Sequence, residues 1–233
     1  MNSFTKLWLL LIFSLLIFQS SCTYNNVVDV EGSDSVSFTQ LQASFPAGEK
    51  DNPGRIKISI NSAEDANFTQ SLPSGLMIML QEGTFSGPES LVGRFNLSMN
   101  TAAYGIENRK NPETTLGLYT GLADVKMDLL LSSASNTIME EDSFTGFYFE
   151  FFAKQHLTTQ LYGRASLGLA FALDNTSTGM TELDIGLAYK LIKKMEIIGG
   201  IKRWSYNRSE IENQSGFLLD INGPYLAFSF LFE

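Results

Sequence analysis

The sequence predicts an all-β fold: an antiparallel up-and-down transmembrane β-barrel of eight strands, or of ten if residues 36–61 add a hairpin. Three observations support this prediction. Strand-like runs of about 9 to 17 residues recur from residue 74 to the C-terminus. Within these runs, apolar residues alternate with small or charged ones. Short connections alternate with longer polar ones, which is typical of membrane barrels.

The first 22 residues have the layout of a bacterial export signal. Lys6 precedes an apolar run from Leu7 to Phe18, and two serines precede Cys22, the only cysteine of the chain. The stretch resembles a lipoprotein signal, which implies lipidation of Cys22 and anchoring of the new N-terminus in a membrane. Gln19 departs from that pattern, since an aliphatic residue is usual there. Cleavage after Cys22 by signal peptidase I is the alternative.

Residues 23–73 are predicted to form a polar N-terminal segment ahead of the barrel. Residues 23–35 are Asn-rich and indicate a tether. Two possible strands follow, VSFTQLQASF and RIKISIN, around the turn-rich stretch PAGEKDNPG. Whether they join the barrel stays open at this stage.

The barrel domain is predicted to span residues 74–233. Its strands are expected at 74–82, 91–104, 115–131, 143–154, 159–173, 181–190, 195–207 and 216–232. Short turns are expected near 155–157 and 192–194, and long polar loops near 132–142, 174–180 and 209–215.

The two faces of each strand differ in polarity. In residues 161–173, Leu167, Leu169 and Phe171 share one face, and Arg164 and Ser166 share the other. A soluble sandwich would turn the charged face to water, whereas a barrel in lipid turns the apolar face outward and fills its lumen with the polar one. Strand length, the glycines on the polar face, the export signal and the aromatic C-terminus favour the barrel over an exported sandwich.

This assignment places eleven charged residues in the lumen, six acidic and five basic. They are Arg94, Asp124, Lys126, Asp128, Glu150, Lys154, Arg164, Glu182, Asp184, Lys190 and Asp220. Because the charges nearly balance, we expect them to pair with one another in a lumen that eight strands leave just wide enough for side chains. The alternative is an ion path or a ligand cavity.

In two strands the apolar residues move from one parity to the other partway along the strand. In residues 115–131 the apolar positions move from even to odd numbers, which predicts a bulge near Ala123. In the last strand, Leu219 and Ile221 are odd and Leu226 is even, which predicts a bulge at Gly223–Pro224. Each bulge would keep the apolar side chains on a single outer face.

The chain ends in PYLAFSFLFE, in which Phe228, Phe230 and Phe232 take alternate positions. This ending resembles the C-terminal signature of bacterial outer-membrane barrels, although Glu233 adds one residue after the last aromatic. Residues 74–233 are similar in pattern to the small eight-stranded barrels of the outer-membrane protein A and X type. The resemblance implies a place in the outer membrane of a Gram-negative cell envelope, beside lipid and lipopolysaccharide, after delivery to the barrel-insertion machinery.

The composition argues against several function classes. The formal net charge of −9 disfavours nucleic acid as a partner. With one His and one Cys, no metal site or other cofactor is expected. His156 is predicted in a periplasmic turn, on the wrong side for an outer-leaflet lipid enzyme. The acidic run Glu140–Asp142 is predicted to be a solvated loop rather than a cation site.

The sequence therefore predicts a non-enzymatic barrel with a structural, adhesive or surface-recognition role carried by its loops. A narrow channel or a binder of small apolar molecules is the first alternative, and an outer-membrane lipid-modifying enzyme is the second. The oligomeric state and any ligand stay open.

Overall fold

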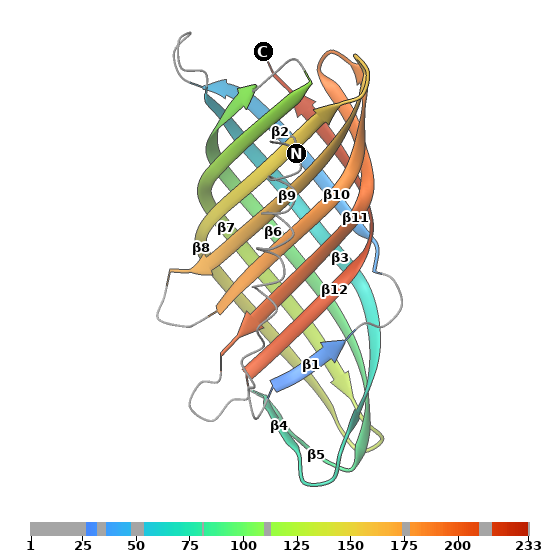
Figure 1. The fold of residues 1–233 in the computed structure, drawn as a ribbon. Coiled ribbons are helices and arrows are strands. Elements are labelled where there is room, and N and C mark those ends of the chain that lie inside the picture. Colours follow the sequence, from blue (N-terminus) through green and yellow to red (C-terminus); the bar gives the residue numbers. More distant parts are fainter. Residues whose placement is uncertain are drawn as a thin grey trace, which may run out of the picture.

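The computed structural model describes residues 27–31, 36–47, 54–80, 82–109, 113–173, 178–209 and 216–232. Among these residues, nine strands close into one barrel, drawn in Figure 1. They are β2 (Phe38–Ala47), β3 (Gly54–Leu72), β6 (Glu89–Arg109), β7 (Thr114–Ser132), β8 (Thr137–His156), β9 (Leu161–Ala172), β10 (Thr178–Ile192), β11 (Met195–Arg208) and β12 (Gly216–Leu231). Each strand pairs antiparallel with the next, and β12 closes the barrel against β2 in parallel.

The barrel has two distinct ends (Figure 1). The C-terminal end carries the connections at 48–53, 110–113, 157–160 and 193–194. The hairpin end carries the connections at 133–136, 173–177 and 209–215, together with a separate two-stranded hairpin of β4 (Met77–Leu80) and β5 (Gly83–Ser86). The predicted loop at 132–142 is mostly strand, because β8 begins at Thr137.

The strand count differs from both predicted values, eight and ten. The segment at 74–82 lies outside the barrel wall, since β4 and β5 have only four residues each and pair with one another. Strands β2 and β3 join the wall, as in the alternative in which residues 36–61 add a hairpin, so the barrel begins at Phe38 and not at residue 74. In β3, Ile56, Ile58 and Ile60 alternate with polar residues, the pattern of the other wall strands.

The outer wall changes from apolar to polar at a common level. On β7, Leu122 is outward and paired with Phe147 of β8, which is also outward. One step toward the hairpin end, Asp124 is outward and paired with Thr145. The same change occurs on β11 between Ile201 and Arg203.

Exposed apolar side chains of all nine strands form a belt next to the C-terminal end, which we call the apolar band. Its members include Leu41, Ile56, Ile58, Ile60, Tyr104, Ile106, Leu118, Leu122, Phe147, Phe149, Phe151, Phe171, Ile185, Leu187, Tyr189, Ile201, Leu226, Phe228 and Phe230. The outward side chains between the band and the hairpin end form the polar wall. Its members include Ser62, Glu64, Arg94, Asn96, Ser98, Asn100, Asp124, Lys126, Asp128, Glu141, Ser143, Thr145, Arg203, Ser205, Asn207, Asp220 and Asn222. Exposed apolar residues such as Val92, Leu130 and Met139 also occur near the hairpin end.

The interior changes in the opposite sense. Inside the apolar band, β3 buries Lys57, Ser59 and Asn61, whereas nearer the hairpin end it buries Ala63 and Phe68. One half of the barrel is thus apolar outside and polar inside, and the other half has the reverse arrangement.

Neither predicted bulge is present. The pairing of β7 with β6 and β8 is continuous through Ala123, and that of β12 with β11 is continuous through Gly223 and Pro224. Leu219 and Ile221 point inward, and Leu226 points outward. The apolar positions change parity because the apolar face of the strand is the inner one behind the polar wall and the outer one in the apolar band. No register correction is needed.

Pro224 lies where the neighbouring strand is interrupted. The short strand β1 (Val27–Glu31) pairs in parallel with Gly216–Asp220, and β2 takes over at Tyr225. From Glu31 to Phe38 the chain advances seven residues while β12 advances five. Within this interval, Val36 N donates to Asn222 O of β12. Pro224, which has no N–H to donate, lies in this interval between the pairings at Asp220 and Tyr225.

Candidate functional site

A network of buried charges fills the lumen inside the apolar band. Arg164 of β9 and Asp184 of β10 form an ion pair at 3.2 Å. Lys57 of β3 pairs across the lumen with Glu150 of β8. Because buried charges need partners, these two ion pairs compensate the charges that they bury.

Lys202 lies at the centre of this network and is fully buried. Its Nζ donates to Glu182 Oε1 at 2.5 Å and to Gln40 Oε1 and Asn61 Oδ1 at 3.2 Å each. Tyr225 contributes a cation–π contact, with its ring centroid 5.2 Å from Nζ. All three donor positions of the ammonium are used within the barrel.

The polar lumen opens toward the C-terminal end. There Lys154 pairs with Glu107 at 3.5 Å, and Tyr162 donates to Glu196 at 2.6 Å. The remaining cavity, which Lys57 also lines, has a volume of about 30 Å³. That is room for a water molecule rather than for an organic ligand.

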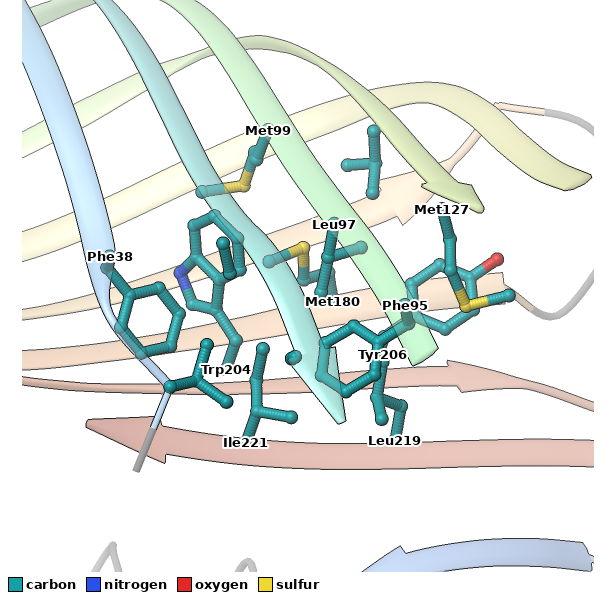
Figure 2. Packing of buried hydrophobic residues seen from close by; sticks show 14 of the residues in the cluster. Phe38, Phe95, Leu97, Met99, Met127, Met180, Trp204, Tyr206, Leu219 and Ile221 are labelled. Atoms are coloured by element: carbon teal, nitrogen blue, oxygen red, sulfur yellow. The ribbon is translucent and has the colours of Figure 1, made fainter. Parts of the chain in front are cut away.

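An apolar core fills the lumen behind the polar wall. Figure 2 shows Phe38 against Trp204 on one side of this core, and Phe95 and Tyr206 on the other. The Phe38 and Trp204 rings meet edge to face at 5.0 Å. Its largest side chains are fully buried: Trp204, Tyr206, Phe38, Phe95, Leu91, Leu97, Met99, Met127 and Leu129. This half is packed like the core of a soluble protein.

The hairpin of β4 and β5 covers the end of this core. Ile78, Leu80 and Phe85 are buried. Gly83 lies so near Ile138 of β8 that an added Cβ would fall 2.7 Å from Ile138 Cδ1. The core is thereby closed at the hairpin end.

A second ion-pair group lies next to the hairpin end. Arg208 contacts Glu140 at 2.8 Å and Asp142 at 3.2 Å, and Tyr206 donates to Asp142 at 2.5 Å. Burial, followed by the charge of Asp142, raises the pKa of Tyr206. Burial by itself would lower the pKa of Arg208, but Glu140 and Asp142 hold it above its ordinary value. The run Glu140–Asp142 is therefore not the solvated loop predicted from the sequence, since two of its carboxylates point inward.

A shallow groove indents the polar wall at a bulge of β3. The register with β6 shifts between Ala63 and Ala66. Beside it, Glu64, Asn96, Lys126 and their neighbours border a space of about 330 Å³ open to solvent.

Six of the predicted lumen residues lie inside the barrel, on strands β8, β9 and β10. They are Glu150, Lys154, Arg164, Glu182, Asp184 and Lys190. The structure brings together Arg164 with Asp184, but it pairs Glu150 and Glu182 with the lysines Lys57 and Lys202, which the predicted set lacked.

The other five predicted lumen residues lie on the polar wall: Arg94, Asp124, Lys126, Asp128 and Asp220. The prediction was wrong for these residues because it assumed lipid outside every strand along its whole length. Behind the polar wall most of the interior is apolar, so these five charges point outward. Asp220 pairs on the outside with Arg203, and Lys126 lies 3.9 Å from Asp124.

Several lumen residues were missed. Lys57, Asn61 and Gln40 belong to β2 and β3, for which the prediction left open whether they join the barrel. Their signal is present in RIKISIN, where isoleucines alternate with polar residues. Lys202 was missed although it has the same parity as Trp204 and Tyr206, its inward neighbours.

His156 is the last residue of β8 and not a turn residue. Its ring lies 5.4 Å from that of Tyr162, at the C-terminal end. Within the described ranges, no group of three or more His, Cys, Asp or Glu side chains is arranged to hold a metal ion. Cys22 lies outside the described residues.

The part of the chain that the structure describes has no helix of the length and hydropathy needed to cross a membrane. Comparison with known proteins found no match: the chain matches no family model, no curated protein and no solved structure.

Proposed function

We propose that this chain is a non-enzymatic outer-membrane β-barrel that is held in the bilayer by the apolar band, with a structural, adhesive or surface-recognition role carried by the half behind the polar wall. The observation that carries the proposal is the change at one level from an apolar to a polar outer wall, matched by the opposite change inside. A soluble barrel has no reason to expose apolar side chains on all nine strands.

The width of the band fits a bilayer. On β10 the outward apolar run extends from Leu183 to Leu191, nine residues. A tilted transmembrane strand needs about 9–11 residues to cross the hydrocarbon region. The charged side chains Lys57, Glu150, Arg164, Asp184, Glu182 and Lys202 of the lumen are meanwhile buried and paired.

The filled lumen supports a role other than conduction. The polar network occupies the half inside the band, and the apolar core with its covering hairpin occupies the other. Among the described residues, neither half of the lumen contains a cavity large enough for an organic ligand. A recognition role then falls to the outer surface of the polar wall and to the hairpin, where Leu76 and Met77 are exposed.

The position of His156 supports a non-enzymatic role. A lipid-modifying enzyme needs its nucleophile and base at the rim beside the leaflet that holds its substrate. His156 instead lies at the C-terminal end, against Tyr162.

The proposed location in the bacterial outer membrane rests on the export signal and on the last strand. Leu226, Phe228 and Phe230 lie on the outer face of β12, as the resemblance to the insertion signature requires. The nine-stranded count departs from the even number of single-chain bacterial barrels, so the likeness to the outer-membrane protein A and X type is limited to general architecture.

Fractionation tests the proposal. The mature protein expressed in a Gram-negative host should sediment with outer membranes, resist extraction with alkaline carbonate, and migrate faster on a gel before boiling than after. A closed barrel resists detergent until heated, whereas peripheral proteins are stripped by carbonate. Recovery as a soluble periplasmic protein would refute the membrane span.

Lipidation of Cys22 is part of the proposal. Metabolic labelling with palmitate should mark the wild-type chain and not Cys22→Ala. An unlabelled wild-type chain that begins at Thr23 by N-terminal sequencing would instead assign processing to signal peptidase I.

A further inference from the structure

The described chain enters and leaves the barrel at opposite ends. β1 begins with Val27 beside Gly216, the first residue of β12. β12 then runs to the C-terminal end, where Phe232 N donates to Ser44 O at 2.8 Å. Because β1 and β2 are both parallel to β12, the chain enters at the hairpin end and finishes at the C-terminal end (Figure 1).

The odd strand number explains this arrangement. Antiparallel neighbours reverse the chain direction, so an even number of strands returns the chain to the end where it started. Nine strands do not, and the first and last of them must meet in parallel. This closing pair of β2 and β12 is called the seam below.

Resting on the proposed membrane span, we infer that Val27 and Phe232, the first and last residues that the structure describes, lie on opposite faces of the membrane. Val27 lies on the face that carries the polar wall and the hairpin. Between the two faces, the seam crosses the apolar band, where Leu41 pairs with Phe228.

Engineered disulfides test the direction of the seam. Ala43 faces Phe230 in the parallel register, whereas an antiparallel seam centred on the Leu41 and Phe228 pair would bring Ala43 to Leu226. With a membrane-permeant oxidant, the double variant Ala43→Cys with Phe230→Cys should cross-link almost completely. The matched control Ala43→Cys with Leu226→Cys should cross-link at least tenfold less. The reverse preference would overturn the inference.

Tag accessibility tests the two faces directly. A protease-cleavable epitope is inserted between Asn26 and Val27, and in a second variant after Glu233. Two control variants carry it between Ala134 and Ser135 at the hairpin end, and between Lys193 and Lys194 at the C-terminal end. In intact cells, the tag before Val27 should be cleaved or protected together with the 134/135 tag. The tag after Glu233 should show the opposite state, together with the 193/194 tag.

The outcomes separate the inference from the proposed function. Equal accessibility of the two terminal tags, with the two control tags still on opposite faces, would overturn the inference and leave the membrane span intact. The same state for all four tags, whether cleaved or protected, with Leu187→Cys reacting readily with a water-soluble maleimide, would refute both.

Discussion

Phe38 on β2 and Trp204 on β11 meet edge to face, with ring centroids 5.0 Å apart, although β12 lies between their strands in the sheet. One layer nearer the C-terminal end, Lys202 of β11 donates to Gln40 of β2 at 3.2 Å. These inward side chains connect β2 to the strand beyond its neighbour. The seam is thus stabilised by side-chain contacts inside the lumen as well as by the backbone hydrogen bonds between β2 and β12.

The central ion pair should matter far more than an ion pair on the outer wall. Lys202→Met leaves the Glu182 carboxylate buried without its main partner, which should cost about 3–5 kcal/mol of unfolding free energy. The double variant Lys202→Met with Glu182→Gln should recover part of this loss. Urea unfolding followed by the fluorescence of Trp204 measures both.

The adjacent residue provides the matched control for the central ion pair. Arg203 pairs with Asp220 on the polar wall, and its side chain is 48% exposed. Arg203→Met should change stability by no more than about 1 kcal/mol. Similar losses for Arg203→Met and Lys202→Met would contradict the burial of Lys202.

A charge should be tolerated on the polar wall and not on the apolar band. Leu187→Arg places a guanidinium near the middle of the outward run of β10, where it should cost about 2–4 kcal/mol in a bilayer. Asn207→Arg is an exposed polar-wall control and should stay within about 0.5 kcal/mol of the wild type. Heat-modifiable gel migration after insertion into lipid vesicles measures assembly. Equal tolerance of the two arginines would show that the band does not contact lipid.

The wild-type barrel should not conduct ions. The apolar core of the hairpin half and the paired charges of the other half leave no continuous water path among the described residues. In planar bilayers we expect no regular conductance steps. Deleting residues 74–87 should leave the barrel closed, because the apolar core fills the lumen itself and the hairpin only covers the end of that core. Replacing Phe38 and Trp204 together by Ala should raise the leak. Regular wild-type steps would show that the lumen is open.

Two glycines should respond in opposite ways to an added methyl group. A Cβ at Gly121 would collide with the Ala102 carbonyl oxygen of β6, so Gly121→Ala must move the backbone and should destabilise by about 1–3 kcal/mol. Nothing lies within 4 Å of a Cβ at Gly163, so Gly163→Ala should be neutral or slightly stabilising. Thermal midpoints in detergent compare the two. A loss at Gly163 equal to that at Gly121 would contradict the close approach of β6 and β7.

The sequence was sufficient to predict the barrel and seven of its nine strands, because the two-residue alternation is a local signal. It was not sufficient to decide which face is inside. In β7, Leu118 and Lys126 are both even and both point outward, one onto the apolar band and the other onto the polar wall. Without the register that aligns Asp124 with Thr145, the change looks like a slip in one strand rather than a level shared by several.

The missing lumen partners have the same origin. Because the place of β2 and β3 was left open, Lys57 was not recognised as the counterion of Glu150. Lys202, the counterion of Glu182, was missed on β11 itself. The parallel seam pairs residues that are far apart in the sequence, so no local sequence pattern predicts it. It follows only from the odd number of strands.

The seam also has a consequence for the order of assembly. Gln40 and Lys202, which fasten it, are 162 residues apart in the chain, so the ring cannot close before nearly all of the polypeptide is available. Until then β2 and β12 each present an unpaired backbone edge, which is a template for aggregation. A chain truncated within β12 should therefore fail to close its barrel. In the full chain, the early strands depend on protection by other proteins until β12 is available for pairing.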